Sequence, residues 1–262
     1  MGAHNAGRRP RSRPQVAQAE LAWHEEQAQA RRSLDALLYD PPAFDALTAD
    51  GFAHLRPVAG QRLLEIGCGE GKETLALAGR GLRLIASDLS PAQLERARRR
   101  LAAALPGAAV QFLQANGEEL PFGPGAFELV YAKAVLHHID LAQAAEEIFR
   151  LLRPGGRAAV AEPLAHHPLF WLARRLTPGW RSQDEHPLTY AELARFGRRF
   201  PASEVRAYFL FAPLAYPLRA LAGGEGLFRW LHARLGRLDR WLLRRWPALG
   251  RLAWYGAVLI SK

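Results

Sequence analysis

The sequence is poor in cysteine and has no long apolar run. Its 262 residues include a single cysteine, Cys68, which excludes an internal disulfide and indicates a reducing compartment. No stretch reaches the length of a membrane span, and no apolar segment of signal-peptide length follows the arginines near the N-terminus. We therefore expect a cytoplasmic protein that does not cross a membrane.

Acidic residues are also scarce relative to basic ones. Lysine and arginine together number 35 against 25 aspartates and glutamates, a formal net charge of +10. Lysine occurs only at Lys72, Lys133 and Lys262, so arginine carries the excess. This charge would attract anionic substrates, anionic lipid or nucleic acid. Because the sequence has no RNA-binding signature and no interleaved aromatic and basic residues on a predicted strand, we expect no nucleic-acid partner.

The length suits one α/β domain with a full core. Residues 1–19 place four arginines among Gly, Pro, Ser and Gln, a composition that predicts a disordered basic tail. Residues 20–262 are expected to form a single domain. Its predicted parts are leading helices in 20–58, a core in 60–163, and a substrate-side segment with a helical insertion in 164–254.

Strands and helices alternate along the core. The predicted strands are 62–67, 82–87, 109–114, 126–132 and 156–162, and the predicted helices are 71–79, 91–104 and 141–152. A helix at 188–200, a strand near 204–210 and a last strand at 255–261 follow. This order is typical of a doubly wound, mostly parallel sheet, in which ligands bind beyond the carboxyl ends of the strands.

Alternate glycines follow the first strand. Gly67, Gly69 and Gly71 leave main chain without side chains where a helix begins, and a ligand can lie on such main chain. Asp88 ends the second strand, and its carboxylate can accept hydrogen bonds from ribose hydroxyls. The spacing fits neither the dinucleotide fingerprint nor the phosphate loop, and Glu65 disfavours a pyrophosphate but suits an ammonium group. The sequence therefore predicts a site for a nucleoside that carries an amino acid.

Five segments of this region resemble the class I S-adenosylmethionine (SAM) dependent methyltransferases, specifically the type 11 group. They are residues 63–71, 85–90, 116–122, 127–139 and 148–156. The resemblance implies a Rossmann-like sheet of seven strands in the order 3-2-1-4-5-7-6, with an antiparallel pair at one edge. It also implies SAM as the cofactor and leading helices that cover it.

The resemblance assigns residues to the cofactor. The residues expected to contact SAM are Glu65, Gly67, Cys68, Gly69, Gly71, Asp88, Leu89, Asn116, Gly117, Glu118 and Tyr131. Many relatives carry Asp where this chain has Asn116, so an acceptor for the adenine amine there would be the amide oxygen. Cys68 is expected to be a structural thiol and not a nucleophile.

Histidine suits the removal of a proton from an oxygen or nitrogen acceptor. The candidates are His137, His138, His166 and His167. An alternative role for His137 and His138 is to shape the pocket without taking a proton. The expected substrate contacts are Glu162, Trp171 and His186. A metal site could also be drawn from Asp184, Glu185 and His186 together with His166, His167 and Glu162. These residues lack firm ligand spacing, so no metal is expected. Residues 184–187 are instead predicted to cap the helix near Leu188.

The insertion at 211–254 has an amphipathic pattern. Apolar residues at helical spacing share one face, namely Leu227, Trp230, Leu231, Leu235, Leu238, Trp241 and Leu242. Arginines occupy the opposite face, namely Arg229, Arg237, Arg240 and Arg244. Such a helix suits peripheral contact with a membrane through 227–246, a cap on the fold, or the lining of a pocket for a hydrophobic acceptor.

Taken together, these features predict a SAM-dependent methyltransferase that acts on a small or lipid-like hydrophobic molecule. Two alternatives stay open. A nicotinamide-dependent oxidoreductase would share the generic order of strand, glycine loop and aspartate. A SAM-binding module without catalytic activity, working at a membrane or partner surface, would keep the same glycine loop. The acceptor atom and the oligomeric state cannot be read from the residues.

Overall fold

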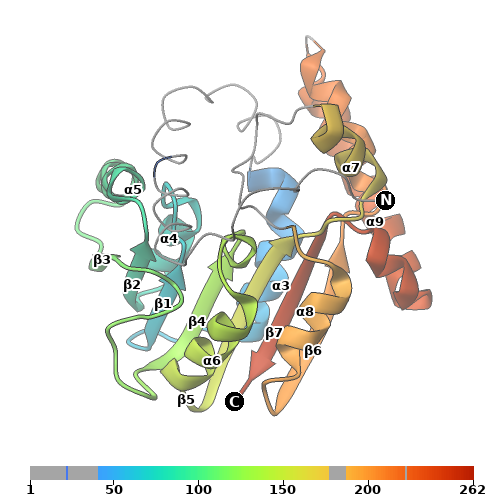
Figure 1. Cartoon of the computed structure of the whole chain (residues 1–262). Helices are drawn as coiled ribbons and strands as arrows, with labels where there is room; N and C mark the ends of the chain where they lie inside the picture. Colours follow the sequence, from blue (N-terminus) through green and yellow to red (C-terminus); the bar gives the residue numbers. More distant parts are fainter. Residues whose placement is uncertain (1–21, 23–40, 177–186, 222) are drawn as a thin grey trace.

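A computed structural model describes residues 22, 41–176, 187–221 and 223–262 of the chain. It contains one seven-stranded sheet in the order β3-β2-β1-β4-β5-β7-β6, which confirms the predicted order (Figure 1). The strands are β1 (Arg62–Ile66), β2 (Arg83–Asp88), β3 (Val110–Gln114), β4 (Phe127–Lys133), β5 (Leu152–Pro163), β6 (Ala202–Tyr208) and β7 (Tyr255–Ser261). The first five are parallel, whereas β7 is antiparallel to both β5 and β6.

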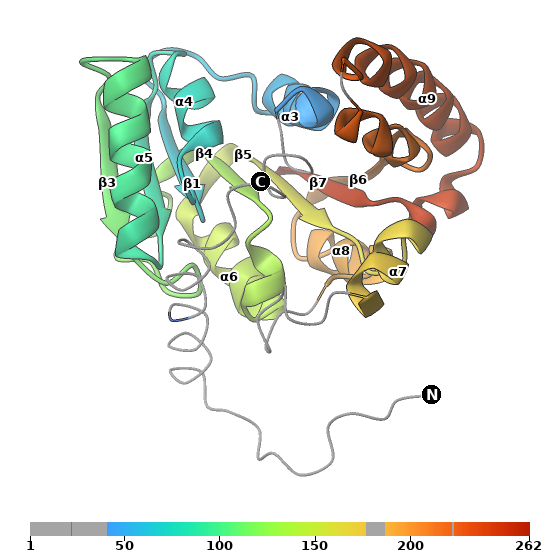
Figure 2. The same cartoon turned by 90° about the horizontal axis from the view of Figure 1, so that it is seen from above.

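Helices cover both faces of the sheet. The described α-helices are α3 (Pro41–Leu55), α4 (Lys72–Ala78), α5 (Pro91–Ala104), α6 (Leu141–Leu151), α7 (Pro168–Leu176), α8 (Tyr190–Gly197) and α9 (Glu225–Arg245). Three 3-10 helices are η1 (Leu136–His138), η3 (Ala212–Ala220) and η4 (Pro247–Leu252). Seen from above, α3, α4 and α5 lie on one side of the sheet, and α6 and α8 lie on the other (Figure 2).

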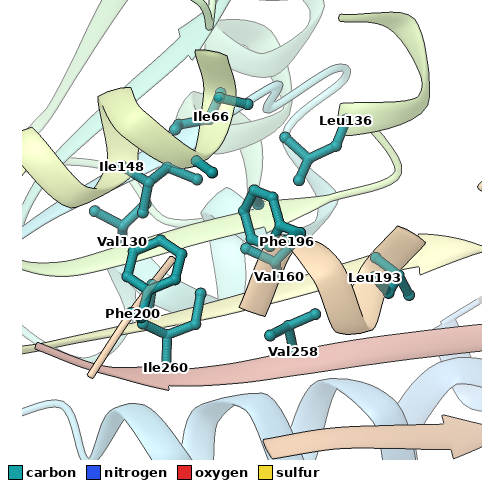
Figure 3. Close-up of a cluster of buried hydrophobic side chains, with 14 of the residues drawn as sticks. Ile66, Val130, Leu136, Ile148, Val160, Leu193, Phe196, Phe200, Val258 and Ile260 are labelled. Carbon is teal, nitrogen blue, oxygen red and sulfur yellow. The ribbon is translucent and has the colours of Figure 1, made fainter. Parts of the chain in front are cut away.

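The two faces follow from the alternation of side chains along the strands. In β1, Leu64 and Ile66 face α6 and α8, where they join a cluster of buried side chains from β4, β5 and β7 (Figure 3). Leu63 faces the opposite side and packs beneath α3 and α4. Glu65, two residues later, therefore also faces α4, where a carboxyl group has no water around it.

Local signals explain most helix ends. Ser90 accepts a hydrogen bond from the main chain of Gln93 at 3.3 Å and is followed by Pro91, as expected for the start of α5. The predicted cap of α8 was wrong. Thr189 is its N-cap and forms a reciprocal capping box with Glu192, so the helix begins at Tyr190.

The insertion forms a cap beside the sheet. Helix α9 runs without a break through Gly236, and its inner side packs with η3 on an aromatic cluster. Phe170 of α7 joins this cluster, with its ring stacked on Trp254 at 3.9 Å. Asp239 of α9 is buried and accepts hydrogen bonds from the main-chain N–H groups of residues 210, 211 and 212 at 2.8 to 3.0 Å.

Some expectations fall on parts of the chain outside the described residues. These are the basic tail, the first of the leading helices and residues 184–186. Within the described part, none of the helices combines the length and the apolarity that a bilayer crossing requires.

Asp239→Ala should destabilise the protein, because it leaves three main-chain N–H groups without their buried acceptor. We expect a loss of about 2 to 4 kcal/mol in the free energy of unfolding, measured from urea transitions. Glu225→Ala, which removes an exposed carboxylate from the same helix, should leave the midpoint nearly unchanged. Equal midpoints for the two variants would show that α9 is not anchored through Asp239.

Candidate ligand site at the carboxyl edge of the sheet

The three glycines after β1 have different surroundings. A Cβ atom on Gly67 would lie 2.5 Å from Val135, and one on Gly71 would lie 2.9 Å from Ala97 of α5. These two positions are glycine because main chain packs closely there. A Cβ atom on Gly69 would meet no heavy atom of the described residues within 4 Å. Gly69 alone of the three leaves its Cα side open for a ligand.

Asp88 fixes the position of this open glycine. Its Oδ2 accepts the N–H of Gly69 at 2.8 Å, and its Oδ1 accepts the N–H of Ser90 at 2.9 Å. Partial burial raises the pKa of the carboxyl, while these main-chain donors act in the opposite direction. A carboxylate has about four lone-pair sites, so each oxygen can accept one further hydrogen bond. Asp88 can thus hold the loop and two hydroxyl groups of a ligand together.

Negative charge gathers beneath the loop. The buried Glu65 accepts a hydrogen bond from the hydroxyl of Thr74 at 2.6 Å, and burial raises its pKa to about 8. The carboxylates of Glu73 and Asp88 raise it further, whereas Lys133, which is ion-paired with Glu73, lowers it. A cation placed here would stabilise the ionised form of Glu65, and a pyrophosphate would be repelled. The charges fit a ligand that carries an ammonium or a sulfonium group.

Cys68 and Tyr131 were predicted at the ligand edge, but both side chains are buried in the core. The Cys68 side chain packs with Ala86 and with the inner side of α5, and burial raises the pKa of its thiol. Tyr131 is paired in register with Glu65, so its ring points to the same face and lies 5.5 Å from Phe52 of α3. The register of β4 against β1, which the sequence pattern left open, decides the direction of the Tyr131 side chain.

The segment after β3 closes the edge beside Asp88. Oδ1 of Asn116 accepts the N–H of Glu118 at 3.1 Å, and the Glu118 carboxylate accepts the N–H of Asp140 at 2.7 Å. Glu118 therefore ties this loop to the start of α6. Gly117 packs on Ile66, where a Cβ atom would approach to 3.0 Å. Leu89, directly after Asp88, is half-buried.

Glu162 organises the loop after β4. It is fully buried at the end of β5, and its Oε1 accepts the N–H groups of Val135 and Leu136 at 2.9 and 2.8 Å. Its Oε2 lies 2.7 Å from Nδ1 of His137. The predicted contact of Glu162 with substrate stays a prediction; in the structure its oxygens bind groups of the protein itself. Sequence reasoning missed this role, since the pairing spans 25 residues and leaves no local signal.

The two neighbouring histidines act on different carboxyl groups. The His137 ring is held by Glu162 and lies 4.1 Å from the ring of His138. The His138 side chain acts electrostatically on Asp88 and lowers the pKa of that carboxyl.

The remaining predicted residues lie around α7. His166 is exposed, whereas His167 is buried, with Nε2 3.1 Å from the carbonyl oxygen of Leu210 and its ring next to Phe170. Trp171 is about half exposed, and the guanidinium of Arg175 lies 4.7 Å above its ring. His186 lies outside the described residues. The described part of the chain contains no group of three or more His, Cys, Asp or Glu side chains that could hold a metal ion.

Sequence reasoning also missed Thr74 and the ion pair between Glu73 and Lys133. The hydroxyl of Thr74 faces Glu65 because both belong to the inner sides of neighbouring elements. Glu73 lies in the first turn of α4, the helix that follows β1, and Lys133 lies at the end of β4. Their opposite charges could have indicated the ion pair, because neighbouring parallel strands end at the same edge of the sheet.

Comparison with known proteins places the chain in one family. The sequence model of a family described as "Methyltransferase domain" matches residues 64–160. The chain is 35% identical over 126 residues to the O-methyltransferase cnsE of Penicillium expansum, covering 47% of this chain and 46% of that protein. It is 32% identical over 229 residues to a malonyl-[acyl-carrier protein] O-methyltransferase of Enterobacter lignolyticus, covering 86% of this chain and 81% of the relative. Against some relatives, such as cnsE, the match thus spans less than half of their length.

A solved structure shares the fold. Phosphoethanolamine N-methyltransferase 2 of Haemonchus contortus, in complex with S-adenosyl-L-methionine, superposes with a TM-score of 0.63 at 19% identity. The superposition covers 92% of this chain and 60% of that one.

Stability should depend on pH through Glu65. Its pKa is about 8 in the folded state against 4.5 as the ordinary value, so folding favours the protonated form. Its contribution is complete below about pH 4.5 and is lost as the pH rises through 8. Between pH 5 and 8 the wild type should lose roughly 2 to 4 kcal/mol of unfolding free energy relative to Glu65→Gln.

Urea transitions of the two proteins at pH 5, 6, 7 and 8 measure this difference. The control Glu95→Gln, which changes an exposed carboxylate on α5, should keep the wild-type slope. Parallel curves for the wild type and Glu65→Gln would mean that Glu65 is ionised in the folded protein at neutral pH.

Proposed function

The chain belongs to the class I S-adenosylmethionine-dependent methyltransferases, and from this premise we propose that it methylates a small or lipid-like hydrophobic acceptor beside the glycine loop and helix α7. Its cofactor is S-adenosylmethionine. The observation that carries the proposal is the surroundings of Gly69. This glycine has open space beside its Cα atom, donates its N–H to Asp88, and belongs to a loop near the carboxyl groups of Glu65 and Glu73.

Specific residues would hold the cofactor. The remaining lone pairs of Asp88 would accept the ribose hydroxyls, and the Glu65 carboxyl would face the ammonium group from beneath Gly69. Leu89 and Asn116 would border the adenine. When bound, the cofactor supplies a methyl carbon that is already activated by a sulfonium. The protein then contributes mainly by orienting the acceptor for in-line attack.

The nicotinamide alternative has little support. A dinucleotide would place its pyrophosphate at the glycine loop, where the carboxylates of Glu73 and Asp88, whose charge also raises the pKa of Glu65, would repel it. The matched family and relatives are methyltransferases, and the chain is accordingly an enzyme of that kind.

We propose His137 as the group that accepts a proton from an oxygen or nitrogen acceptor. With hydrogen on Nδ1 donated to Glu162, Nε2 is left as a base and the ring cannot turn freely. His138, on the Asp88 side, would instead border the cofactor. The exposed His166 is a second candidate on the acceptor side, whereas His167 already bonds to main chain.

The nature of the acceptor is proposed from the apolar surface near the site. Helix α7 begins five residues after β5 ends and exposes Leu169, Trp171 and Leu172. Such a surface would bind an apolar molecule through burial of its surface area. The two relatives from Penicillium expansum and Enterobacter lignolyticus are O-methyltransferases, which supports an oxygen atom as the methyl acceptor.

Cofactor binding tests the proposed role of Gly69. In Gly69→Ala the new methyl group should occupy the surface on which the cofactor lies, so its affinity for S-adenosylhomocysteine should fall at least about tenfold. Gly107→Ala is the matched control, because Gly107 also has a positive φ and open space but lies at the opposite edge of the sheet. Calorimetry on both variants gives the two dissociation constants, and thermal unfolding verifies that both are folded.

Asp88→Ala should weaken the same binding at least about tenfold, since it removes a charged hydrogen-bond acceptor. If neither Gly69→Ala nor Asp88→Ala binds more weakly than Gly107→Ala, the cofactor does not lie on this loop.

His137→Gln should lower methyl transfer by roughly 100-fold or more while leaving the affinity for S-adenosylhomocysteine within about twofold. The assay follows labelled methyl from SAM into an organic extract of the source cells, and thermal unfolding verifies that His137→Gln is folded. Equal rates for the wild type and His137→Gln would assign proton removal elsewhere.

A further inference from the structure

Helix α9 exposes apolar side chains that the fold does not need. Its inner side is anchored by the buried Phe228 and Asp239. Four apolar residues instead point outward along one side of the helix, namely Leu227, Trp230, Leu238 and Trp241, with exposed fractions of 52%, 56%, 42% and 59%. Trp246 continues this line at the end of the helix, with its ring 5.5 Å from that of Trp241. We call these five residues the outer stripe.

The outer stripe differs from the apolar face that the sequence predicts. Leu231, Leu235 and Leu242 were expected on the same face, but they turn toward the fold and are partly buried. The apolar surface of α9 is therefore wider than the part that packs on η3 and the aromatic cluster. Because Asp239 binds three main-chain N–H groups, the helix cannot rotate to bury the rest.

The charge around the outer stripe has one sign. All six arginines of α9 are exposed, whereas its two acidic residues are occupied: Asp239 is buried and Glu225 pairs with Arg219 and Arg229. Arg234 and Arg245 lie over rings of the stripe, with guanidinium carbons 5.5 Å and 5.4 Å from the ring centres of Trp230 and Trp246. Guanidinium groups therefore lie both over the rings of the outer stripe and beside it.

Helix α9 also lies where a flat surface can reach it. Figure 2 shows α9 as the outermost element over the β6–β7 side of the sheet, in full view beyond η3. Its 21 residues give a length of about 30 Å, and the stripe runs along almost all of it.

We propose that the outer stripe and its arginines bind the surface of an anionic lipid bilayer, with α9 parallel to the membrane. The tryptophan and leucine side chains enter the boundary between headgroups and acyl chains, and the guanidinium groups pair with lipid phosphates. A second copy of this chain fits poorly, because two such faces would bring like charges together. This inference goes beyond the proposed methyl transfer and does not depend on the cofactor site.

Vesicle flotation of the full chain, without cofactor, tests the proposal. We expect the protein to float with vesicles of phosphatidylcholine containing about 30% phosphatidylglycerol, to stay unbound with phosphatidylcholine alone, and to dissociate at high salt. The triple variant Arg234→Gln, Arg237→Gln, Arg245→Gln should lower partitioning by about 100-fold. The double variant Trp230→Ser, Trp241→Ser should lower it at least tenfold on the estimate for buried apolar area.

Control variants change exposed positions elsewhere. Arg83→Gln, Arg195→Gln and Arg198→Gln together remove the same charge from exposed positions on β2 and at the end of α8, and Val58→Ser removes an exposed apolar side chain. Both controls should float like the wild type. The affinity of every variant for S-adenosylhomocysteine reports whether its fold is intact.

Three results would overturn the proposal. They are the absence of flotation with anionic vesicles, an equal loss in the stripe variants and their controls, and a dimer in solution that dissociates on Trp230→Ser, Trp241→Ser. The last result would assign the stripe to a second copy of the chain. None of the three bears on cofactor binding, so this inference and the methyltransferase function can fail separately.

Discussion

The hydrogen bond from Gly69 to Asp88 is the constraint on which the site depends. It joins the tips of β1 and β2, and it holds Gly69, the glycine of this loop whose Cα side is open. The same carboxylate is the natural partner of a ribose, so the group that shapes the loop also faces the ligand. Close packing of Gly67 on Val135 extends this rigidity to the loop after β4. The edge is thus organised before any ligand arrives, which lowers the entropy that binding must overcome.

Buried carboxyl groups recur where the chain must turn without regular hydrogen bonding. Asp88, Glu162 and Asp239 each accept two or three main-chain or imidazole hydrogen bonds, which compensate for removing a negative charge from water. Glu65 differs, because only the hydroxyl of Thr74 is bonded to it and other carboxyls surround it. The pKa of Glu65 is raised because the carboxyl is buried and few hydrogen-bond donors stabilise its charge. Of the buried acids described here, Glu65 is the one whose charge a cationic ligand would change most.

The sequence predicted the architecture better than the direction of individual side chains. Strand order, the antiparallel closing pair, the start of α5 and the long helix of the insertion follow from periodicity, N-capping and the family resemblance. The burial of the Tyr131 side chain could not be read from the sequence, because strand register decides which face a side chain takes. The structural roles of Glu162 and Asp239 were not predicted, because their hydrogen-bond partners are 25 or more residues away in the sequence. Local patterns contain no information on such pairings, whereas helix periodicity and capping are local.

The insertion shows why an amphipathic pattern alone does not reveal what a helix contacts. Periodicity gives one apolar face for α9, but the fold divides it into a part that packs on the aromatic cluster and a part that remains in water. The division is set by Asp239, whose main-chain partners fix the rotation of the helix. Exposed tryptophans among arginines carry a cost in water that an anionic interface would remove. A helix that needed only to cover the sheet could place polar residues at Trp230 and Trp241 without any loss of internal packing.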